Sequence, residues 1–218
     1  VVLQSRTTYL IAAPLLLYGA WRLLRARRHG WRRVALALLA LALVGAALGL
    51  SPRMQQRLLA SQGEIARYAG QGEPTSMGVR LELWKRSAPI IEAAPWFGHG
   101  LGQWRLAYQR QASAAGVDAG FLMGHPHQEA LLILSEEGIV GFAVFAALLV
   151  GLARHIRRLA RPPRDFYNCL LIIYVTAGLA NCLLVVFSHR HLFLMLLACL
   201  PLAAKPGADA VGAEASAA

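Results

Sequence analysis

Five long apolar runs divide this chain, and they constrain its fold more than any other feature of the sequence. The first four cover residues 7–24, 34–50, 126–152 and 167–187, and a shorter one covers about 192–204. A helix that crosses the hydrocarbon core of a bilayer needs roughly 20 mostly apolar residues. Of the 218 residues, 57% are hydrophobic and only 15% are charged, which is unlike a soluble domain. The sequence therefore predicts an all-α, polytopic membrane helix bundle with about five spans.

The position of arginine predicts the orientation of these spans. The net charge is +11, and much of it lies in two loops without acids, "RLLRARRHGWRR" and "RHIRRLARPPR". Short loops of this kind lie in the cytoplasm, so the charge reflects membrane topology and we expect no nucleic-acid partner. The predicted order is two spans in residues 1–50, a large periplasmic loop in 51–125, three spans in 126–204 and a flexible cytoplasmic tail in 205–218.

The large outer loop is the one segment with a pattern typical of soluble helices. We expect an amphipathic helix over residues 79–92, with Ser76 as its cap. Its apolar face is predicted to comprise Leu81, Trp84, Ala88 and Ile91. A turn, "APWFGHGLG", and a second helical segment, "QWRLAYQRQ", follow, so the loop is predicted to be largely helical.

Two histidines flank a proline where this loop meets the third apolar run. We expect Pro126 in the first helical turn, and His125 and His127 at the boundary between membrane and water. A helix N-terminus favours anions and disfavours a protonated imidazole, so a neutral ring here suits a general base beside a phosphate. Glu136 and Glu137 lie further along the run, either orienting polar partners in the bundle or remaining in the wet interface.

The same stretch carries a longer pattern. His127 and Gln128 are followed by nine residues, "EALLILSEE", then Gly138, two residues and Gly141. This resembles the periplasmic motif of the bacterial O-antigen ligase superfamily: His, then Asn, Ser or Gln, nine residues, Gly, two residues, and Gly, Thr or Tyr. The superfamily also contains O-antigen polymerases and protein O-oligosaccharyltransferases. Every position of the motif is matched.

A second motif of the superfamily lies upstream. It is an "R-x-x-x-W" helix followed by "P-x-x-G-x-G", and here it corresponds to Arg80, Trp84, Pro95, Gly98 and Gly100, with Gly102 after it. The resemblance covers roughly residues 77–152. Since members of the superfamily usually have ten or more spans, we expect this chain to be the C-terminal part of such a protein.

The resemblance implies a metal-independent, GT-C-like glycosyltransferase of the bacterial inner membrane that needs no cofactor. Its donor would be a glycan linked to a polyprenyl diphosphate such as undecaprenyl diphosphate. Its acceptor, at the periplasmic face among the membrane lipids, would be lipid A core in lipopolysaccharide biosynthesis, a growing glycan, or a protein Ser or Thr. The implied catalytic residues are His127 and Arg80, and Gly138 and Gly141 are the motif glycines with a structural role. Beside them we expect substrate contacts from His125, Gln128, Lys85, Arg86 and Arg105, the last three as cations suited to lipid phosphates.

Three alternatives stay open at this stage. Arg80 and His127 could be an ordinary solvated charge and an interfacial side chain. The outer histidines could form a metal site, although they lack the spacing of known zinc motifs. The protein could instead belong to a lipid or polysaccharide transporter, a reading weakened because Asn168, Thr176 and Asn181 are the only polar residues that the fourth run offers.

Overall fold

The computed structural model describes residues 6–25, 75–114 and 124–203, together with short pieces between residues 30 and 64. Every regular element that it describes is a helix, which confirms the predicted class. Most of the second predicted span, residues 34–50, and the predicted tail, residues 205–218, lie outside the described residues.

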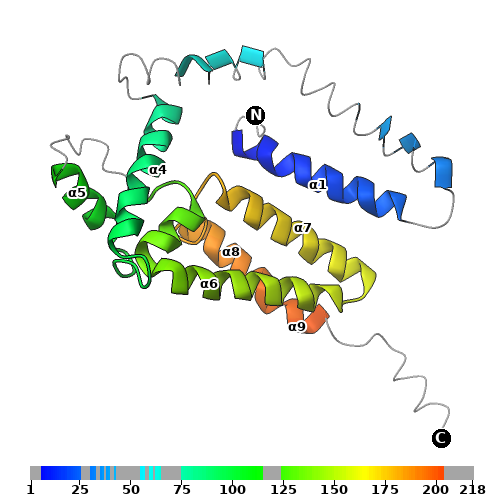
Figure 1. Cartoon of the computed structure of the whole chain (residues 1–218). Coiled ribbons are helices and arrows are strands. Elements are labelled where there is room, and N and C mark those ends of the chain that lie inside the picture. The colour runs from blue at the N-terminus through cyan, green and yellow to red at the C-terminus, as the bar shows by residue number, and fades with distance from the viewer. Residues whose placement is uncertain are drawn as a thin grey trace, which may run out of the picture.

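The long helices fall into two groups (Figure 1). Helices α1, α6, α7 and α8 lie side by side, whereas α4 and α5 pack at the end of the bundle where α6 begins. The helix bounds are α1 Arg6–Leu24, α4 Ser76–Ala93, α5 Trp104–Ala114, α6 Glu129–Arg157, α7 Arg161–Gly178, α8 Phe187–Ala198 and α9 Leu200–Ala203. Helices are therefore present at nearly the places expected for the first apolar run and for the segment "QWRLAYQRQ".

Helix α6 has the properties of a membrane span. Its 29 residues have a mean hydropathy of 2.1 in their most apolar stretch, and only 6% of that stretch is buried inside the protein. A core helix of a soluble domain is mostly covered, and this one is not. In the part of the chain that the structure describes, α6 is the one helix long and apolar enough to cross a membrane, while α1 and α8 contribute shorter apolar helices.

The helix ends differ from the prediction in the C-terminal half. Helix α6 begins at Glu129, so Pro126 lies before it instead of in its first turn. Helix α7 ends at Gly178 although the apolar run continues, because the Glu129 carboxylate accepts the backbone N–H groups of Leu183 and Leu184 and holds them out of a helix. Residues 188–191, which separate the fourth and fifth apolar runs, lie inside α8 instead of forming a loop between two spans.

Helix α4 also differs in two details. Thr75 is its N-cap, accepting the backbone N–H of Gly78 at 3.1 Å, so the predicted cap at Ser76 is wrong. The buried face runs through Leu83, Ser87 and Ile90, one position away from the predicted one. Ser87 is buried because its hydroxyl donates to the Leu83 carbonyl at 2.7 Å, and a hydropathy pattern does not register a polar residue satisfied in this way.

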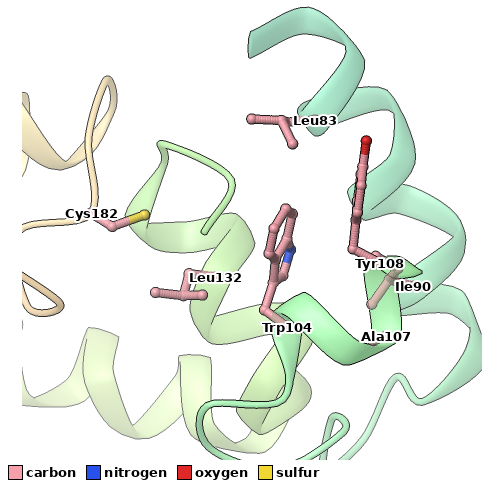
Figure 2. Close-up of a cluster of buried hydrophobic side chains, with 7 residues drawn as sticks. All are labelled: Leu83, Ile90, Trp104, Ala107, Tyr108, Leu132 and Cys182. Carbon is pink, nitrogen blue, oxygen red and sulfur yellow. The ribbon is translucent and has the colours of Figure 1, made fainter. Parts of the chain in front are cut away.

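One hydrophobic cluster joins α4 and α5 to α6 (Figure 2). It comprises Leu83 and Ile90 of α4, Trp104, Ala107 and Tyr108 of α5, Leu132 of α6, and Cys182 from the segment after α7. The rings of Trp104 and Tyr108 stack with centroids 5.1 Å apart, and Trp104 is fully buried. Burying a large aromatic side chain contributes roughly 2–3 kcal/mol, so this cluster fixes α4 and α5 against the start of α6.

Candidate active site

The His-Pro-His turn directly before α6 has an unusual backbone. His127 has φ +56°, the one positive φ of a non-glycine residue among those described. Its backbone N–H donates to Nδ1 of His125 at 3.3 Å, and the two rings meet edge to face with centroids 4.5 Å apart. Because Nδ1 of His125 accepts, a neutral His125 carries its proton on Nε2. His125 thus supports the left-handed turn that sets the orientation of His127.

A hydrogen bond from helix α4 supports this turn. The Trp84 indole N–H donates to the carbonyl of Pro126 at 3.0 Å, and Pro126 is buried. Arg80 precedes Trp84 by four residues, so the two side chains leave the same face of α4. The "R-x-x-x-W" spacing therefore has a structural explanation: the tryptophan binds the turn and places the arginine beside the histidine that the turn carries.

The electrostatics of His127 reflect this arrangement. Burial lowers the pKa of His127 below its ordinary value, a side-chain hydrogen bond with Asn181 opposes that shift, and the positive charge of Arg80 lowers the pKa further. The pKa of His125 is also lowered, by burial first and then by the charge of His127. Both imidazoles are therefore neutral at neutral pH. The Nδ1 atom of His127 is buried and finds no hydrogen-bond partner among the described residues.

Two further residues support the site, although the sequence did not single them out for it. Asn181, in the segment between α7 and α8, is the hydrogen-bond partner of the His127 ring. Glu129, 4% exposed, holds that segment in place through the N–H groups of Leu183 at 2.5 Å and Leu184 at 3.2 Å. An acidic residue at the head of an apolar helix was the available signal for Glu129.

The loop after α4 enters the hydrogen-bond ladder of α6. In a continuous helix, the N–H groups of Ile139 and Val140 would bond the carbonyls four residues earlier. Here they donate instead to the carbonyls of Pro95 at 2.8 Å and Trp96 at 3.1 Å. The carbonyls thus released, at residues 135 and 136, accept the N–H groups of residues 99 and 100 at 3.0 and 2.8 Å. The loop supplies new partners for these two N–H groups and two carbonyls, so none of the four is left unpaired.

Glycine is required on both sides of this insertion. Gly98 and Gly138 have φ +65° and +67°. A Cβ atom on Gly138 would lie 2.4 Å from the carbonyl carbon of Trp96, and one on Gly98 would lie 2.3 Å from that of Glu136. The first glycine of each motif, Gly98 upstream and Gly138 downstream, therefore lies where the two backbones touch. The resemblance implied a structural role for Gly138, and the positive φ and the close Trp96 backbone explain why glycine is needed there.

The neighbouring acids have structural contacts as well. An oxygen of the Glu136 carboxylate accepts the backbone N–H of Trp104 at 3.1 Å, which caps the start of α5. A Cβ atom on Gly141 would lie 2.2 Å from Cβ of Glu137, so the second motif glycine leaves room for that side chain. Glu136 thus fixes the start of α5 against α6.

The other residues predicted to contact substrate differ in their hydrogen bonds and in their exposure. The side chain of Gln128 caps α6 by accepting the N–H of Leu131 at 3.1 Å. Arg86 binds Glu82 at 2.5 Å and lies 5.9 Å from the centre of the Tyr108 ring, so its charge is engaged between α4 and α5. Lys85 and Arg105 are exposed. Lys85 lies about 140° around α4 from Arg80, given 3.6 residues per turn.

Two other histidines have backbone partners of their own. Nε2 of His99 donates to the carbonyl of Ile90 at 2.8 Å, and Nδ1 of His191 donates to that of Phe187 at 2.7 Å. In the described ranges, no group of three or more His, Cys, Asp or Glu side chains is close enough together to hold a metal ion.

The site thus combines an arginine, a neutral half-buried imidazole, and a loop and a helix joined by backbone hydrogen bonds. A family model described as "O-Antigen ligase" matches residues 1–146, which is more than half of the chain. The chain belongs to the O-antigen ligase family. Members of this family are membrane proteins, in agreement with the composition of α6.

The O-antigen ligase family model covers α4, α5, the His-Pro-His turn and the helix break of α6. A relative of this chain is an uncharacterized protein from Haemophilus influenzae, with 26% identity over 124 residues. The similarity covers 55% of this chain and 31% of that protein. The chain thus matches about a third of the relative's length.

Proposed function

We propose that the protein transfers an oligosaccharide or polysaccharide from a polyprenyl diphosphate lipid to an acceptor hydroxyl. The observation that carries this proposal is the placement of Arg80 beside His127, achieved by the Trp84 hydrogen bond to the turn between them. Membership of the O-antigen ligase family supports the same class of reaction. An arginine next to a neutral imidazole suits a reaction with an anionic leaving group and a hydroxyl nucleophile.

His127 acts as the general base. Its lowered pKa keeps the ring neutral, so it can accept the acceptor's hydroxyl proton as that oxygen bonds to the anomeric carbon of the donor sugar. The bond between this carbon and the diphosphate oxygen breaks, and its electron pair leaves with the polyprenyl diphosphate. Arg80 binds the diphosphate through its planar fork and stabilises the developing charge. The route requires no metal ion or cofactor.

The surrounding residues complete the proposal. His125 supports the base. The amide nitrogen of Gln128 and the cations Lys85 and Arg105 contact donor or acceptor. Arg86 supports α4 and α5, the two helices that carry these cations. The site faces the periplasm from the inner membrane, where the donor lipid resides. Among acceptors we favour lipid A core, hence O-antigen ligation; polymerisation of a glycan and glycosylation of a protein Ser or Thr would use the same residues.

Two substitutions separate the two roles. His127→Ala should reduce turnover by roughly 10²-fold to 10⁴-fold through loss of proton transfer, with donor binding largely intact. Arg80→Lys keeps the charge but loses the bidentate fork, so it should weaken donor binding more than turnover. Transfer of lipid-linked glycan to acceptor is measured with the full-length protein in membranes, with protein level checked by blot.

Matched controls come from the far end of α6. His155→Ala and Arg154→Lys change the same residue types at exposed positions, and both should retain full transfer. Full transfer by a well-expressed His127→Ala protein would contradict the catalytic assignment and favour a transporter component instead.

A further inference from the structure

A second polar centre lies at the opposite end of the bundle from His127. It is a cavity of about 660 Å³ whose lining includes four arginines from three helices. Arg22 and Arg25 come from the end of α1, Arg157 from the end of α6 and Arg164 from the start of α7. A smaller pocket of about 340 Å³ shares Arg22 and Arg25 and adds Arg161. We name the two together the basic pocket.

The positive charge of the basic pocket is poorly compensated. Asp165 is the one acid among its lining residues. The Asp165 carboxylate is already occupied, since it accepts the Tyr18 hydroxyl at 2.8 Å and the Arg22 guanidinium at 2.5 Å. Three or more guanidinium groups therefore surround this space without an acidic partner from the lining. Like charges held close together repel, so the arrangement favours binding of an anion.

The pocket is also a built structure. Asn168 donates to the Tyr18 hydroxyl at 3.0 Å, which in turn donates to Asp165, so a chain of hydrogen bonds fixes Arg22 between α1 and α7. The Nε atom of Arg22 is nevertheless buried and has no hydrogen-bond partner within the described part of the chain. Buried donors are rarely left unpaired, and an acceptor that enters the pocket would satisfy this one. An orientation signal for membrane insertion needs only charge and would require neither the cavity nor this framework.

The position and surroundings of the pocket indicate the ligand class. Helix α6 lies between it and His127, and the part of this helix after the break at Gly138, residues 139–157, is about 28 Å long at 1.5 Å per residue, which is close to the thickness of the hydrocarbon core of a bilayer. The pocket therefore lies at the headgroup level of the other leaflet. Two apolar side chains that line it, Trp21 and Leu23, are each 44% exposed.

We propose that the basic pocket binds the phosphate headgroup of an anionic phospholipid. Arginine forks bind the phosphate oxygens, the free Nε of Arg22 gains an acceptor, and the side chains of Trp21 and Leu23 contact the acyl chains. This site is distinct from the Arg80 and His127 centre. It involves no transfer chemistry, so its test does not depend on the proposed function.

The test uses the delipidated full-length protein in detergent, titrated with phosphatidylglycerol or phosphatidylcholine and examined by native mass spectrometry. The wild-type protein should retain phosphatidylglycerol in preference to phosphatidylcholine. Arg157→Gln combined with Arg164→Gln removes two lining charges that take no part in the Asp165 hydrogen bonds and should weaken that retention roughly 10- to 30-fold. Arg154→Gln with Arg158→Gln removes the same charge nearby, outside the lining residues, and should leave it within about twofold.

Three results would overturn the proposal. Equal losses in both double variants, or no preference for phosphatidylglycerol, would mean ordinary surface charge. Displacement of the bound lipid by millimolar inorganic phosphate, with phosphate retained in its place, would identify a soluble phosphate as the ligand instead.

Discussion

At the scale of single residues, the site depends on one backbone conformation. A left-handed residue other than glycine costs of order 1 kcal/mol or more and persists only where its surroundings impose it. At His127 the surroundings are the His125 ring and, through Pro126, the indole of Trp84. Burial and the adjacent Arg80 then determine the protonation of the ring.

The first residue-scale prediction concerns pH. Because the pKa of His127 is lowered, its neutral form should persist below pH 6.5, the ordinary histidine pKa, and be lost as pH falls through the lowered value. Removing the nearby charge by Arg80→Ala should move the midpoint to higher pH. Diethylpyrocarbonate, which reacts with neutral imidazole, reports this titration independently of turnover when the modified histidine is identified by fragment mass spectrometry. An unchanged midpoint in Arg80→Ala would argue against the proximity of the two side chains.

The second concerns Trp84. Trp84→Phe keeps an aromatic ring but removes the N–H that holds the Pro126 carbonyl, a hydrogen bond of about 1 kcal/mol. We expect the transfer rate to fall about fivefold, with little change in protein level, since the turn loses its support. Trp96→Phe is the matched control, because Trp96 is 65% exposed. Comparable losses in both variants would rule out a specific role for the indole.

At the scale of elements, α6 and the loop after α4 form one unit. The loop occupies the positions of four helical hydrogen-bond partners, and Gly98 and Gly138 allow the two backbones to approach. Two motifs that are separate in sequence thereby become a single junction. Through this junction, α4, which carries Arg80, is fixed relative to the start of α6.

Glycine substitution tests the junction. Gly138→Ala places a Cβ atom 2.4 Å from the Trp96 backbone at a positive φ, so it should destabilise the protein by at least about 2 kcal/mol. Gly151→Ala, in the same helix with open space around it, should be neutral or slightly stabilising, because alanine is the better helix former. Thermal stability in detergent, followed by size-exclusion chromatography, provides the comparison. Equal melting temperatures for the two variants would refute the packing argument.

At the scale of the whole molecule, the two polar centres lie at opposite ends of α6. The His-Pro-His turn precedes this helix, and the arginines of the basic pocket surround its end. One apolar helix thus connects a centre suited to the periplasmic face with a basic centre suited to the cytoplasmic face.

Cysteine labelling tests this orientation. In a background without the three native cysteines, Ser113→Cys on α5 should react with a membrane-impermeant thiol reagent added from the periplasm. Ala160→Cys, between α6 and α7, should react only after the membrane is permeabilised, because arginine-rich loops stay in the cytoplasm. Both positions are exposed in the folded protein, so accessibility alone does not distinguish them. The opposite labelling pattern would reverse the placement of the site.

The sequence by itself determined the helical class, the positions of α1, α5 and α6 to within a few residues, and the motifs that contain Arg80, His127 and Gly138. Each of these is local information, because hydropathy and motif spacing report one element at a time. Only the tertiary structure decided where α7 stops, since the apolar run continues past Gly178. The end depends on the Glu129 carboxylate, which lies on another helix.

The same reason explains what the sequence could not show about the site. The partners of His127 come from α4, from the turn before α6 and from the segment after α7, so no single segment contains them. The contact between Gly98 and Gly138 exists because one backbone enters the hydrogen-bond ladder of another. Such pairings follow from how elements pack in space, and no periodicity within one segment encodes them.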